Sequence, residues 1–139
     1  MRAYFFGNFY LSSIQQGIQA QHCTAEMFVK YSVSGESLTK RSHLYDWAEN
    51  HKTSILLNGG DTDGLYNIRE MMYDTTNLYP WAYFRESQSA LNQALTCVGI
   101  ILPERVYEAV AWVPADQVLG LSFWEIRMAE ALKACGMAR

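Results

Sequence analysis

The order of hydrophobic and polar positions predicts a strand and then a long helix at the start of the chain. Apolar and aromatic residues over 3–9 predict the strand, and a helix is expected from Ser12 or Ser13 to about Tyr31. The apolar positions of this helix recur at helical spacing, which predicts a buried stripe made of Ile14, Ile18, Ala25, Phe28 and Val29. Gln21 falls on the stripe and is therefore expected to find polar partners, because an unpaired buried polar group costs about 1–3 kcal/mol.

The rest of the chain predicts three more strands and four more helices. The segments with the apolar content of strands are 53–58, which reads as buried, 79–85 and 94–102. The segments with helical spacing are 43–50, about 65–76, 104–111 and 122–135. The second of these helices has Leu65, Ile68 and Met72 on one face. The last has an inward-facing stripe made of Trp124, Met128, Leu132 and Cys135. Between them, 32–40 is expected to be a polar loop and 112–113 an extended piece.

Two local signals mark the last helix. Ser122 and Glu125 fit a capping box at its start, and Gly136 is expected to cap its end. The whole order predicts an α/β fold, a small three-layer or two-layer sandwich in which helices flank a mixed sheet of about four strands. Residues 1–139 are expected to form a single ligand-binding domain.

Composition narrows the class of partner. The 139 residues are half hydrophobic and only 18% charged, with a net charge of −3, so no basic surface for DNA or RNA is expected. Aromatic residues make up 14%, which favours a homodimer or a higher homo-oligomer, since Tyr and Trp are enriched at interfaces. No apolar run approaches about 18 residues and no signal peptide is apparent, so an intracellular protein without a membrane partner is expected.

Metal and nucleophile patterns are weak. The segment 61–64 resembles the start of a calcium loop, but Leu65 and Met72 stand where oxygen ligands are needed, so a tight turn with an Asp or Thr helix cap is expected instead. The three histidines and three cysteines lack zinc spacing. No nucleophile–base pair or phosphate loop is evident, so we expect no metal, no cofactor and no catalytic residue.

The candidate chemistry gathers around the polar loop 86–93, which two predicted strands hold. Arg85 can fork onto a phosphate, and the aromatic face of Phe84 can stack a purine. Asn92 can both donate to and accept from an adenine or ribose edge. A hairpin loop next to core aromatics would explain the same residues. Arg105 is either a second phosphate ligand or a solvated residue at a helix start.

The helix segment 16–22 resembles the first helix of archaeal-type peptidyl-tRNA hydrolases, matching at Ile18, Ala20 and Gln21. Arg85 and Glu86 resemble the Arg-Asp pair before a loop in that family. Gly17 replaces the lysine of that helix, and Glu86 stands for the loop aspartate. This resemblance implies a shared architecture and, as an alternative function, an esterase acting through Gln21, Glu86 and water.

A closer resemblance is to the first type of phage Thoeris anti-defence proteins. It is carried by the segments 4–19, 25–31, 91–92 and 98–103. The resemblance implies a sponge in the cytoplasm of the infected bacterial host, which sequesters cyclic ADP-ribose isomers without cleaving them. Some members also hold cyclic oligonucleotides at a separate site between subunits. A protein–protein adaptor without a small-molecule pocket is the remaining alternative.

In that family an aromatic residue, an Asn and Arg residues contact the ligand at a dimer interface. Asn92 carries over best, and Phe84 and Arg105 follow. On the chemistry of such a ligand, Phe9, Tyr10 or Phe84 would stack the base, and Arg85 or Arg105 would pair with the pyrophosphate. Asn92 and Gln21 would satisfy hydroxyls or ring nitrogens.

Overall fold

Four strands form one mixed sheet. The computed structural model describes residues 1–32, 37–87, 93–111 and 120–137, with 109–111 described by their backbone alone. The strands are β1 (Arg2–Gly7), β2 (Ser54–Asn58), β3 (Trp81–Arg85) and β4 (Leu95–Leu102), in the order β2-β1-β4-β3. β1 runs parallel to β2 and antiparallel to β4, and β3 runs antiparallel to β4. The predicted α/β fold with a four-stranded mixed sheet is confirmed.

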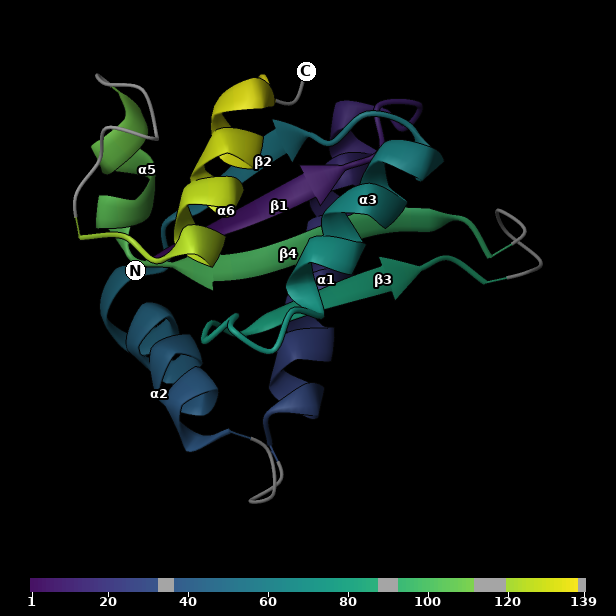
Figure 1. Cartoon of the computed structure of the whole chain (residues 1–139). Helices are drawn as coiled ribbons and strands as arrows, with labels where there is room; N and C mark the ends of the chain where they lie inside the picture. Colours follow the sequence, from purple (N-terminus) through teal and green to yellow (C-terminus); the bar gives the residue numbers. More distant parts are fainter. Residues whose placement is uncertain (33–36, 88–92, 112–119, 138–139) are drawn as a thin grey trace.

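Helices cover both faces of the sheet. They are α1 (Ser13–Lys30), α2 (Leu38–Asp46), the π-helical turn η1 (Trp47–His51), α3 (Thr62–Met72), α5 (Glu104–Ala111) and α6 (Phe123–Ala134). Figure 1 shows α3 and α6 in front of the sheet and α1 behind it. One core cluster lies between the sheet and α3, α5 and α6, and a second lies between the sheet and α1, α2 and η1. The architecture is therefore a three-layer sandwich.

The long first helix begins where expected, but it buries a different face. Ser12 caps α1 in a capping box with Gln15, which confirms the predicted start. The predicted stripe is wrong, since Ile14 is 77% and Val29 is 67% exposed, and Gln21 is exposed as well. The residues that face the sheet instead are Gln16, Gln19, Ala20, Cys23 and Met27.

Close packing explains this choice of face. A methyl group added at Gly99 of β4 would lie 2.9 Å from both Cys23 Sγ and Met27 Cε. The helix thus approaches the sheet so closely that only its face of small and slender side chains fits. Branched Ile14 and Ile18 remain on the outer face because the space between helix and sheet is already full.

Two further elements differ from expectation. α2 begins at Leu38, capped by Ser37, rather than at 43, so the predicted loop 32–40 is wrong over its last residues. The apolar run of β2 predicts a buried strand, but β2 is an edge strand whose only buried residue is Leu57. Met137 forms a bridge to Leu57, and Asn58 N donates to Gly136 O at 2.8 Å. Gly136 therefore continues toward β2 rather than capping α6 in a left-handed conformation.

Two predictions for the starts of helices are confirmed. Asp61 caps α3, and its Oδ1 accepts from Gly64 N at 2.8 Å, as expected of a tight turn. Ser122 and Glu125 form the capping box of α6, whose Trp124 is buried. The extended piece expected at 112–113 lies outside the described residues. In the described part of the chain, none of the helices has the length and apolarity needed to cross a membrane.

Candidate functional site

A β-bulge shapes the end of the sheet from which the 86–93 loop departs. Phe84 pairs with Cys97, but Arg85 pairs with Leu95, so Thr96 is the extra residue. Thr96 Oγ1 donates to Gln19 Oε1 of α1 at 3.1 Å. The bulge thus turns Thr96 toward α1 on one face of the sheet, while Arg85 contacts α3 on the other.

On the α1 face, Gln19 is the centre of a polar network. It is 5% exposed, and its Nε2 donates to Glu86 Oε2 at 2.9 Å. Its Oε1 accepts from Thr96 and lies 3.3 Å from His22 Nδ1. The His22 ring packs against Phe84 with 4.6 Å between the ring centroids. This network fixes the position of Phe84 and of the first loop residue.

Glu86 is held in its ionised form. The hydrogen bond from Gln19, followed by one from Ser87 N, lowers the pKa of the Glu86 carboxyl below its usual value. A general base works best when its pKa lies near the working pH. These contacts therefore favour a positioning role for Glu86 over proton transfer.

A hollow of about 480 Å³ follows β3, which is one of the two edge strands of the sheet. Glu26, Val29 and Lys30 of α1 border one side, Tyr73 beyond α3 borders the other, and Trp81–Arg85 forms the floor. Its volume lies within the range of about 300–1,000 Å³ that is typical of ligand sites. Lys30 Nζ lies 3.6 Å from the centroid of a Trp81 ring and donates to Trp81 O, so one end of the strand edge is covered.

On the α3 face, Arg85 joins a group of aromatic and cationic side chains. Its Nη1 donates to Tyr66 Oη at 2.7 Å and to Gln93 O at 3.2 Å. Arg69 of α3 also lies over the rings of Tyr66 and Tyr83. The floor of the hollow thus has Phe84 directed to one face of the sheet and Arg85 to the other.

The structure brings some of the predicted site residues together. Phe84 and Arg85 line the same hollow. Phe9 and Tyr10 follow β1 at this end of the sheet and stack on each other, with 4.2 Å between ring centroids. Phe9 borders a different hollow, of about 600 Å³, next to Gln16.

Two other predicted residues have no described place in the site. Gln21 points to solvent, and the prediction that it lies buried among polar partners is wrong, because Gln19 holds that position. Asn92 lies outside the described residues.

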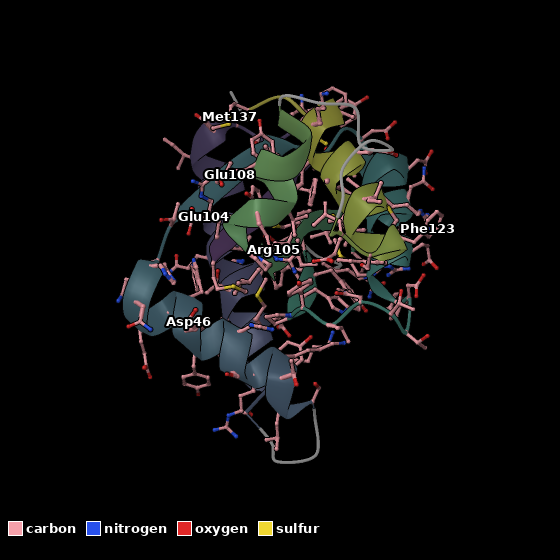
Figure 2. All side chains as sticks on the ribbon, turned by 60° about the vertical axis from the view of Figure 1, so that its left-hand side comes forward. Asp46, Glu104, Arg105, Glu108, Phe123 and Met137 are labelled. Atoms are coloured by element: carbon pink, nitrogen blue, oxygen red, sulfur yellow. The ribbon has the colours of Figure 1, made fainter. Side chains whose placement is uncertain are left out.

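Arg105 lies at the other end of β4 from Arg85. It lies in the first turn of α5, beyond the last residue of β4, whereas Arg85 pairs with the first residue of that strand. Figure 2 shows Arg105 on α5 beside Glu104 and Glu108. Arg105 Nη2 forms an ion pair with the buried Glu125 at 2.8 Å and also donates to Tyr79 Oη. Within this chain, exposed Arg105 therefore pairs with a buried carboxylate and does not converge with Arg85 on one phosphate.

Sequence reasoning missed Gln19, His22 and Thr96 on one face and Arg69 on the other. A signal for the first was present, since Gln16, Gln19 and Cys23 share a helix face with Ala20, a pattern typical of close packing against a sheet. Arg69 lies on an amphipathic helix with no sequence feature that links it to Arg85.

No family model matches the chain, and a search of curated proteins finds no match to its sequence. Among the described residues, no three His, Cys, Asp or Glu side chains gather in a way that could hold a metal ion. The ligand of the hollow along β3 has therefore to be inferred from the side chains that line it.

Proposed function

We propose that this protein binds and sequesters cyclic ADP-ribose-type signalling nucleotides without cleaving them, and that the nucleotide lies along β3. The observation that carries this proposal is the hollow whose floor combines aromatic side chains with Arg85. A stacked base contributes about 1–3 kcal/mol, and a guanidinium can bind a phosphate through two parallel hydrogen bonds. Both kinds of contact are available within one hollow of suitable size.

The resemblance to phage Thoeris anti-defence proteins supplies the biological setting of the proposal. The protein would act in the cytoplasm of the infected bacterial host, where a sponge blocks Thoeris defence by removing its signal. Phe84 and Asn92 would contact the ligand as that resemblance implies. A separate site for cyclic oligonucleotides is a further part of the same proposal.

A second copy of the chain would complete the site. β3 is an edge strand, and such a strand readily pairs with another chain. A ligand enclosed from both sides is shielded from water better than one in an open hollow. We therefore propose a homodimer or higher homo-oligomer, and light scattering that shows only a 15.9 kDa monomer at micromolar concentration would contradict it.

The proposal is tested by thermal melting with and without cyclic ADP-ribose isomers, followed by heating and chromatography of the released ligand. We expect a higher melting temperature and intact ligand, because a ligand that binds only the native state stabilises it by mass action. Phe84→Ala and Arg85→Gln should lose the rise. Arg41→Gln is the matched control, since Arg41 stacks on Tyr45 of α2, away from β3.

The alternative is a peptidyl-tRNA hydrolase-like esterase, in which Glu86 would act beside Gln19. The proposed trio of Gln21, Glu86 and water does not form, because Gln19 occupies the place beside Glu86. Turnover of an aminoacyl ester that is lost in Glu86→Ala would establish the esterase. If no ligand raises the melting temperature and no ester is turned over, the remaining function is that of a protein–protein adaptor without a small-molecule pocket.

A further inference from the structure

Arg69 and Arg85 share two tyrosine rings on the α3 side of β3. Arg69 Cζ lies 4.8 Å from the centroid of the Tyr66 ring and 5.0 Å from that of Tyr83. Arg85 Cζ lies 5.1 Å and 5.9 Å from the same two centroids. Two guanidinium groups from different elements therefore both lie against the same pair of tyrosine rings.

Among the described residues, one carboxylate forms an ion pair with these two arginines. Within the described residues, the one ion pair of Arg69 is with Glu70, at 3.4 Å, and the Glu70 side chain is 66% exposed. Arg85 donates its hydrogen bonds to two neutral oxygens, Tyr66 Oη and Gln93 O. Cations that share the same aromatic rings and are paired mainly with neutral groups create a local positive potential that attracts an anion.

Arg69 also has an unused donor. Its side chain is only 16% exposed, and its Nε is buried without a hydrogen-bond partner in the described part of the chain. A buried donor without an acceptor is unfavourable, so the surroundings of Arg69 leave its guanidinium incompletely paired. A bound anion would therefore stabilise the two guanidinium groups.

An exposed aromatic ring adjoins the two arginines. Tyr73 is 54% exposed, borders the hollow along β3, and lies 5.9 Å from Arg69 Cζ. Its ring is held edge-on to Trp81, with 4.8 Å between centroids. A planar group carried by the anion would therefore find an aromatic surface beside the positive charges.

We propose that Arg69 and Arg85 together bind a diphosphate group and that Tyr73 receives the nucleoside attached to it. This inference rests on the proposed function in that Arg85 lines the same hollow, and it names the ligand class more narrowly. Two adjacent phosphates can engage both guanidinium forks, whereas a single phosphate engages one. The site should therefore prefer a diphosphate linkage over phosphates that are separated by a ribose.

Isothermal titration of the full chain with inorganic pyrophosphate, orthophosphate, ADP and AMP at one ionic strength tests the proposal. Wild-type protein should bind pyrophosphate and ADP at least about tenfold more tightly than orthophosphate and AMP, since one charge-assisted hydrogen-bonded contact is worth that much. Arg69→Gln should lose this preference, and Arg41→Gln should keep it. Arg69→Lys keeps the charge but not the planar fork, so it should bind with a reduced preference even if Arg69→Gln folds poorly.

Each outcome decides something specific. Equal binding of diphosphate and monophosphate by wild-type protein, or unchanged pyrophosphate binding in both Arg69 variants, would overturn the diphosphate site. A melting shift with cyclic ADP-ribose isomers that is as large in Arg69→Gln as in wild type would also overturn it, while leaving the proposed function intact. Arg69-dependent binding of pyrophosphate and ADP without any response to cyclic isomers would retain the site and reject the proposed function.

Discussion

Gln19 Nε2 of α1 donates to Glu86 Oε2, 2.9 Å away, and so ties the middle of a helix to the residue that follows β3. The same side chain accepts from Thr96, the extra residue of the β-bulge. One glutamine therefore holds the helix, the bulge and the start of the 86–93 loop in fixed relation. The part of the floor of the hollow that carries Phe84 depends on this polar contact as well as on apolar packing.

Replacing Gln19 should destabilise the fold far more than replacing Gln21. We expect Gln19→Ala to lower the free energy of unfolding by about 1–3 kcal/mol, because the buried hydroxyl of Thr96 loses its acceptor on Gln19. Gln21→Ala, on the exposed face of the same helix, should change it by less than about 0.5 kcal/mol. Urea unfolding measures both, and a larger effect of Gln21→Ala would show that α1 is turned the other way.

Two glycines should respond to alanine in opposite directions. Gly99→Ala would place a methyl group 2.8 Å from Phe5 Cδ1 and 2.9 Å from Cys23 Sγ, so overpacking should cost about 1–3 kcal/mol. Gly17→Ala, in α1, meets no atom within 4 Å and should stabilise the protein by about 0.5–1 kcal/mol. Thermal melting of the two variants side by side checks the close approach of α1 to β4.

Glu125 should make the protein sensitive to acid. Burial raises the pKa of its carboxyl, but hydrogen bonds from Ser122 N and Tyr79 Oη, with the charge of Arg105, outweigh burial and hold that pKa below its usual value. The ionised carboxylate of Glu125 therefore stabilises the folded state fully above its unfolded-state pKa, and this stabilisation is lost as pH falls through the folded-state pKa. Unfolding free energies at pH 7 and at about pH 3 should differ less in Glu125→Gln than in wild type.

Tyr79 should limit stability at high pH. Burial, followed by its hydrogen bond to Glu125, raises the pKa of the Tyr79 hydroxyl to about 12. The pKa of a tyrosine hydroxyl in the unfolded chain is about 10. The protonated Tyr79 hydroxyl therefore stabilises the folded state fully below about pH 10, and this stabilisation is lost as pH rises through the folded-state pKa. Tyr79→Phe should show a flatter alkaline limb, and an identical limb in both proteins would contradict the assignment.

Arg105 should matter for stability and not for ligand capture. Arg105→Gln leaves the carboxylate of Glu125 without its cation, which should cost about 1–2 kcal/mol. The melting shift with cyclic ADP-ribose isomers should remain at its wild-type size, in contrast to Arg85→Gln. Loss of capture in a folded Arg105→Gln protein would instead place the ligand at the opposite end of β4.

The predicted elements succeed where the signal is local. Ser12 and Ser122 cap helices because a side-chain oxygen reaches a backbone N–H three residues ahead, which needs no other part of the chain. Asp61 ends the turn before α3 in the same way. The strands follow from apolar runs bounded by turn residues, so the succession of elements along the chain and the α/β class follow from the sequence alone.

The buried face of α1, the edge position of β2 and the neighbours of the arginines were decided only by the tertiary structure. Which stripe of a helix is buried depends on how much space its partner leaves, and Gly99 leaves room for Cys23 and Met27 but not for a branched stripe. A single strand, β4, separates Arg85 from Arg105 in the sequence, and the two arginines lie at opposite ends of this strand. The sequence by itself determined the local elements because their hydrogen bonds are local, whereas the site required contacts between residues that only the packed sheet brings together.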